Sequence, residues 1–119
     1  LLSRVYLGWG HDQYGLREGV AFLTDHAAPK MNEPMIYYWY YATQLMHHYG
    51  GAPWEAWNER MSEILVRTQS PRGKHAGSWE PRGPFGGAGG RLYVTALSVC
   101  TLEVYYRHLP LFRPIELDE

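Results

Sequence analysis

The chain of 119 residues has a single cysteine, a formal net charge of −1 and no long hydrophobic run. One cysteine, Cys100, excludes an internal disulfide framework. The near-zero charge gives no electrostatic footprint for nucleic acid or for an anionic membrane surface, so no nucleic-acid partner is expected. No segment reaches the roughly 18 to 20 apolar residues that cross a bilayer, which argues against a transmembrane segment in this chain.

Sequence patterns that bind metal ions are also absent. The sequence has six histidines but no His-Glu-x-x-His pattern. His47 and His48 are adjacent, so on a helix their side chains would point about 100° apart and address one metal poorly. The sequence therefore predicts neither a metal site nor a cofactor.

Aromatic side chains, by contrast, are abundant, with ten Tyr and five Trp beside only three Phe. Tyr and Trp combine a large apolar surface with one polar group. Such an excess is typical of thick helix–helix interfaces or of the lining of a cavity.

Apolar residues at helical spacing, together with flanking Gly and Pro, predict an all-α chain of five helices. The expected helices cover residues 3–9, 14–25, 32–48, 53–68 and 91–109. Asn32 and Pro34 should cap and begin the third helix, Gly50 and Gly51 should end it, and Pro110 should end the fifth.

These helices are of two kinds. Residues 36–46 and 92–106 are apolar on nearly every side, whereas the second and fourth helices each have one polar face. The corresponding segments recur at roughly 45 to 50 residues, near the upper end of familiar repeat periods. Buried helices that alternate with half-buried ones favour a two-layer array of helical hairpins over a plain helical bundle.

One motif gives this array a family resemblance. Leu65-x-x-x-Gln69 followed by Gly77-Ser78-Trp79 resembles the QW repeat of the squalene cyclase and protein prenyltransferase superfamily, with a longer spacer than usual. Residues 40–51, 90–97 and 102–110 also resemble bacterial proteins of that superfamily. The resemblance implies an α/α toroid with inner apolar helices and outer amphipathic helices. The chain begins at Leu1 without Met, and its first expected helix, residues 3–9, reads as the tail of a longer helix. Residues 1–119 would therefore be a single partial toroid domain, the C-terminal portion of a longer protein.

The catalytic groups of this superfamily do not appear at their expected spacing. Cyclases use an Asp-x-Asp-Asp acid, but Asp12, Asp25 and Asp118 are scattered. Prenyltransferases hold zinc with Asp-x-Cys, and here Ser98 stands two residues before Cys100. The resemblance therefore implies a non-catalytic scaffold or binding module, and its alternative is part of a terpenoid cyclase or prenyltransferase whose catalytic residues lie in a missing N-terminal region.

The motif itself predicts a structural role. A glutamine at the end of an outer helix, here Gln69, can hydrogen-bond the unpaired backbone groups of an adjacent helix terminus. Trp79 can cover that bond and exclude water. We expect Gln69, Gly77 and Trp79 to form a structural staple between the two layers.

Two further sets of residues are candidates for ligand binding. One face of the third helix carries Tyr37, Tyr40, Tyr41, Gln44 and His48. It could line a cavity for an apolar or isoprenoid ligand, and core packing is the alternative. The glycine-rich residues 86–90 lead into a helix at Arg91, which could contact an anion, and a flexible crossing between the layers is the alternative. Other partners would be a second protein or the remainder of the toroid.

Overall fold

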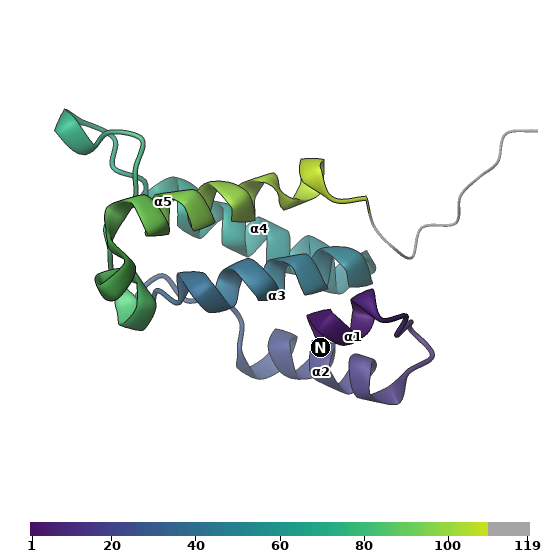
Figure 1. Cartoon of the computed structure of the whole chain (residues 1–119). Helices are drawn as coiled ribbons and strands as arrows, with labels where there is room; N and C mark the ends of the chain where they lie inside the picture. The colour runs from purple at the N-terminus through teal and green to yellow at the C-terminus, as the bar shows by residue number, and fades with distance from the viewer. Residues whose placement is uncertain (110–119) are drawn as a thin grey trace, which may run out of the picture.

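A computed structural model describes residues 1–109, and the regular structure of that part of the chain is helical. The elements are α1 (Leu2–Tyr6), α2 (Tyr14–His26), α3 (Ile36–Tyr49), α4 (Gly51–Thr68), the 3-10 turn η1 (Gly73–His75) and α5 (Gly83–Arg107). The predicted all-α class is confirmed (Figure 1). One isolated antiparallel bridge joins Gln69 to Trp79.

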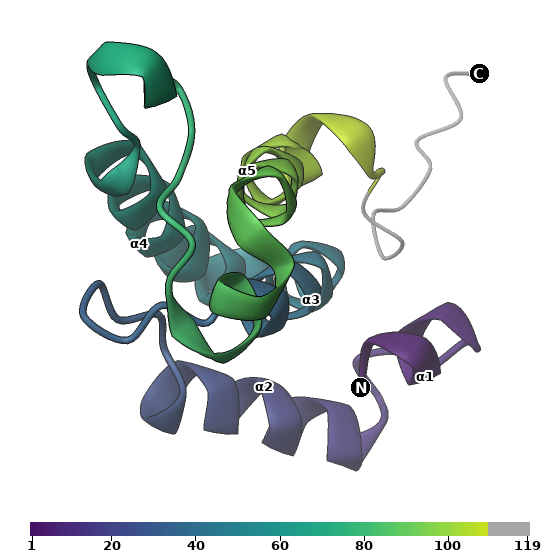
Figure 2. The ribbon, with the colours of Figure 1, turned by 60° about the vertical axis from the view of Figure 1, so that its left-hand side comes forward.

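Helix α3 lies at the centre of the molecule. It packs against α1 on one side and against α4 and α5 on the other (Figures 1 and 2). Its last turns are buried on all sides, and even the polar side chains of Thr43, Gln44, His47 and His48 are at most 5% exposed. A helix that is apolar nearly all round needs such surroundings.

A single residue, Gly50, connects α3 to α4. Its φ of 75° belongs to the left-handed region that glycine adopts without strain, so the chain reverses within one residue. Helix α4 then buries one face against α3 and α5, through Trp57, Met61, Ile64 and Leu65, and leaves the opposite face to solvent. This is the amphipathic pattern expected for residues 53–68.

The start of α3 differs from the prediction. Helix α3 begins at Ile36, with Met35 at its N-cap, and no cap bond from Asn32 is found among the described residues. Gly83, at the start of α5, approaches so closely that an added Cβ would collide with the carbonyl oxygen of Pro34. Tertiary packing of this segment therefore replaces the local cap that Asn32 and Pro34 predicted.

Helix α5 also differs from the prediction. It begins at Gly83, so most of the expected glycine-rich loop is a short helix, and the helix breaks at Gly90, where φ is 78° and ψ is −178°. Gly90 supplies the left-handed conformation that turns the chain into the long second part of α5. The last helical residue is Arg107, and the expected stop at Pro110 lies outside the described residues.

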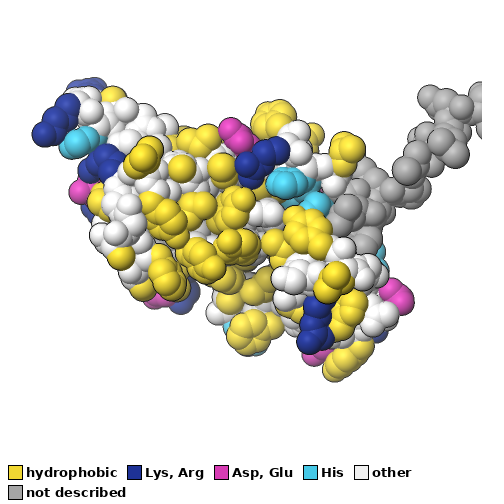
Figure 3. Space-filling model, viewed as in Figure 1, with side chains coloured by type: hydrophobic (Ala, Val, Ile, Leu, Met, Phe, Trp, Pro, Cys, Tyr) yellow, Lys and Arg dark blue, Asp and Glu magenta, His cyan; other side chains and the backbone are white. Residues whose placement is uncertain are grey.

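One side of α5 is exposed although it is apolar. Leu92 and Tyr106 are 84% and 86% exposed, and Val99 and Tyr105 lie on the surface as well. Figure 3 shows hydrophobic side chains gathered over α3 and α5 on this face. None of the helices in residues 1–109 combines the length and the apolar character that a membrane span requires.

Candidate functional site

The candidate site residues lie in three places, the first of which is the junction of Gln69, Gly77 and Trp79. The side-chain amide of Gln69 donates to the carbonyl oxygen of Gly77 at 3.0 Å. The indole Nε1 of Trp79 donates to the carbonyl oxygen of Leu65, in the last turn of α4, at 2.8 Å. Gly77 has a φ of 80°, which lets the chain turn back toward α4.

The hydrogen-bond partners of Gln69 and Trp79 differ from the expected ones. Gln69 binds a loop carbonyl, whereas Trp79 binds the carbonyl at the helix end. Trp79 is only 4% exposed, and its backbone N–H donates to Thr95 Oγ1 of α5 at 3.2 Å. Trp79 therefore links α4 to α5, and nothing in the local sequence pointed to Leu65 or Thr95 as its partners.

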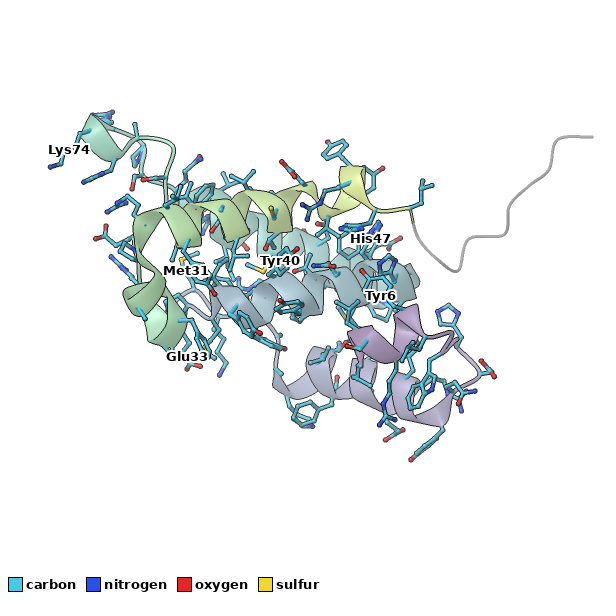
Figure 4. All side chains as sticks on the ribbon, viewed as in Figure 1. Tyr6, Met31, Glu33, Tyr40, His47 and Lys74 are labelled. Carbon is cyan, nitrogen blue, oxygen red and sulfur yellow. The ribbon has the colours of Figure 1, made fainter. Side chains whose placement is uncertain are left out.

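The second place is a groove beside α3 with a volume of about 620 Å³. We call it the tyrosine groove. Its wall on α3 includes Tyr37, Tyr40, Tyr41 and Gln44, four of the five residues expected to line a cavity. Its other wall is formed by α1 and by Leu23 of α2. In Figure 3 this recess lies between α3 and the α1–α2 pair, and Figure 4 labels Tyr40 on α3 and Tyr6 on α1.

Aromatic contacts hold the tyrosines of the groove in place. The ring of Tyr41 lies 5.0 Å from those of both Tyr37 and Tyr40, in edge-to-face geometry. Tyr37 also contacts Phe85 of α5 at 5.0 Å. Such pairs contribute roughly 0.5–1.5 kcal/mol beyond the area that they bury. The tyrosine wall is thus fixed on the α3 side and open toward α1.

His48 takes a different position from the other four. It is not among the residues that line the groove, because it lies buried beneath Tyr6. The Tyr6 hydroxyl donates to Gln44 Oε1 at 3.1 Å, and His48 Nε2 lies 3.2 Å from the same hydroxyl. The hydroxyl proton of Tyr6 is directed to Gln44. In the bond between His48 and Tyr6, the Nε2–H of His48 is therefore the donor and the Tyr6 hydroxyl oxygen is the acceptor. Sequence reasoning missed Tyr6, since its role depends on a contact 38 residues away along the chain.

The groups around this hydrogen-bonded chain are kept neutral. Burial, followed by the neighbouring His47 and His108, lowers the pKa of His48 to about 4. Burial also raises the pKa of Tyr6 and lowers that of His108. The lining groups Tyr6 and Gln44 are therefore polar but uncharged at neutral pH, and the one charge that acts on this end of the groove within residues 1–109 is the Arg107 guanidinium, which interacts with Tyr6 and Tyr40.

The third place is Arg91, which was expected as an anion contact and is bound by residues of its own chain. Its guanidinium donates to Ser78 Oγ at 3.1 Å and lies 3.5 Å from Glu80 Oε2. The Cys100 thiol accepts a hydrogen bond from Arg107 at 3.4 Å. No group of three or more His, Cys, Asp or Glu side chains within residues 1–109 could hold a metal ion.

Of these three places, the tyrosine groove is the one that offers space for a ligand. No family model, curated protein or solved structure matches the chain.

Proposed function

We propose that this chain is part of a squalene cyclase- and prenyltransferase-like repeat protein and acts as a non-catalytic binding module, with an elongated apolar ligand of isoprenoid type in the tyrosine groove. The observation that carries the proposal is the groove itself. Its volume of about 620 Å³ falls within the range of small-molecule sites, roughly 300 to 1,000 Å³.

The lining of the groove suits an unsaturated hydrocarbon chain. Four tyrosines of α3 form one wall, and the leucines Leu1, Leu2, Leu23 and Leu45 contribute apolar surface around it. Gln44 and the Tyr6 hydroxyl offer a polar end that could receive a terminal hydroxyl group. An apolar body with one neutral polar end matches this distribution better than a charged ligand does.

The family part of the proposal rests on the hairpin of α3 and α4 and on the junction at Trp79. A buried helix followed by an amphipathic one, with the QW residues joining α4 to the next helix, is the arrangement that one unit of an α/α toroid would need. The exposed apolar side of α5 would then face the remainder of the toroid.

Binding of farnesol to the full-length protein tests the ligand, with thermal unfolding as the readout. A ligand present at 100 times its Kd stabilises the folded state by about 2.7 kcal/mol. We expect farnesol to raise the melting temperature, Tyr41→Ala to abolish the rise, and Tyr105→Ala to leave it intact. Tyr105 is the matched control because it is an exposed tyrosine on α5 that does not line the groove.

Three results would overturn the proposal. If farnesol fails to shift melting, or if both variants respond like the wild type, then the tyrosines are packing residues only. If farnesyl diphosphate is instead converted to product by the full-length protein, the module belongs to a cyclase or transferase with catalytic residues outside this chain.

A further inference from the structure

A second cavity, of about 400 Å³, lies at the opposite end of α3 from the His47–His48 pair. It is bounded by the start of α3, the end of α4, the segment from Gln69 to Arg82 and the side of α5, and Figure 4 labels Met31 at this end. Trp39, Leu65 and Trp79 supply apolar walls. This cavity shares no lining residue with the tyrosine groove, so it is a separate site.

The charges around the second cavity leave a surplus positive group. Arg67, Glu80 and Arg82 all line it. Arg67 lies 3.2 Å from Glu63, and Glu80 lies 3.5 Å from Arg91, so these two charges are already paired. Within residues 1–109 no ion pair is found for Arg82. Because arginine matches the geometry of a carboxylate, Arg82 favours an acidic ligand at the mouth.

A buried hydroxyl group points to a second polar contact. Ser98 of α5 lines the cavity and is 0% exposed, and its Oγ has no hydrogen-bond partner among the described residues. A buried polar group without a partner destabilises the fold. A ligand that brings a hydroxyl or carbonyl group to Ser98 would remove that cost.

We propose that this second cavity binds a small carboxylic acid whose apolar body carries a hydroxyl or carbonyl group at its far end. The carboxylate pairs with Arg82, the body packs on Trp39 and Trp79, and the far group bonds to Ser98. This site does not depend on the tyrosine groove or on the ligand proposed for it.

Calorimetric titration of the full-length protein with three probes of equal chain length tests the proposal. The probes are decanoate, 10-hydroxydecanoate and decanol. We expect decanoate to bind at least tenfold more tightly than decanol, and 10-hydroxydecanoate to bind more tightly than decanoate. Equal binding of decanoate and decanol, or binding of neither acid, would overturn the proposed site. Equal binding of the two acids would show that Ser98 does not contact the far end of the ligand.

Variants assign the binding to these residues. Arg82→Glu should weaken decanoate binding at least tenfold, whereas Arg72→Glu, at an exposed arginine outside the lining, should change it less than twofold. Ser98→Ala should remove the preference for 10-hydroxydecanoate, and Tyr41→Ala should leave decanoate binding unchanged. Equal effects of the two arginine variants, or loss of binding in Tyr41→Ala, would show that the acids bind elsewhere.

Discussion

Trp79 donates its indole N–H to the carbonyl oxygen of Leu65, fourteen residues earlier in the chain, at 2.8 Å. The same side chain is 4% exposed and belongs to the main hydrophobic core. One residue outside any helix thus adds a second donor at the end of α4, where the Gln69 N–H also donates to Leu65, and fills the space between α4 and α5.

The first prediction concerns this contact. Trp79→Ala should lower the free energy of unfolding by about 3–5 kcal/mol, as for other buried aromatic truncations. Trp79→Phe keeps the apolar bulk but leaves the Leu65 carbonyl without the indole donor, so it should cost less than Trp79→Ala. Urea denaturation measures both, with Tyr106→Ala, at an 86% exposed side chain, as the control. An unchanged midpoint for Trp79→Ala would contradict the role of Trp79 as a staple.

The second prediction compares two glycines of α5, Gly87 and Gly90. Gly90 has a φ of 78° and nothing within 4 Å of an added Cβ, so Gly90→Ala suffers only from backbone strain and should destabilise by about 1 kcal/mol or more. Gly87 is helical and equally free of neighbours, so Gly87→Ala should stabilise by about 0.5–1 kcal/mol. Thermal or urea unfolding of the pair checks the opposite signs. Changes of the same sign would refute the break at Gly90.

The third prediction is a buried hydrogen bond between α4 and α3. Trp57 Nε1 donates to Thr43 Oγ1 at 2.9 Å, and the two side chains are 3% and 1% exposed. Thr43→Val keeps the shape but leaves a buried indole N–H unpaired, which should cost about 1–3 kcal/mol. In the double variant with Trp57→Phe, part of this cost should disappear, since neither polar group is then present. Strictly additive losses in the double-mutant cycle would argue that the bond contributes nothing.

The fourth prediction is a pH dependence centred on His48. Its pKa is about 4 in the folded chain and close to 6.5 when unfolded. As the pH falls from 6.5 to 4, the unfolded chain binds a proton that the folded chain does not, so the free energy of unfolding falls across this window. The groups that face His48 are Tyr6, His47 and His108, and Arg107 lies beside His108 in the chain.

Variants isolate the contribution of His48 from the titration of carboxylates. His48→Gln should lose less stability between pH 6.5 and 4 than the wild type loses, whatever its stability at pH 7. His26→Gln, at an exposed histidine of α2, should follow the wild-type curve. Parallel curves for all three proteins would mean that His48 does not titrate in the way its burial implies.

The sequence predicted those features that depend on local pattern. The helical class, the amphipathic face of α4 and the tyrosine face of α3 all follow from residue spacing, and the structure shows each of them. The prediction of a helix cap at Asn32 was wrong, because packing of Gly83 against Pro34 is a long-range contact that local preferences do not encode.

The partners of the candidate site residues were the hardest part to foresee. Tyr6 meets Gln44 and His48 only because α1 folds back onto α3, and Trp79 meets Leu65 and Thr95 only in the packed structure. The glycine-rich segment before Arg91 was expected to be a loop, since several glycines together usually weaken a helix. In the structure Gly86 is buried, and an added Cβ would lie 3.1 Å from Val94, so this short helix packs closely against the second part of α5.

The single-residue link at Gly50 also bears on how the chain folds. With α3 and α4 joined by one glycine, the contacts between them near the turn close loops of only a few residues, and such loops lose little chain entropy. Contacts of short sequence separation form early in folding. We therefore expect the α3–α4 hairpin to be the nucleus of folding, on which α1 and α5 dock later from opposite ends of the chain.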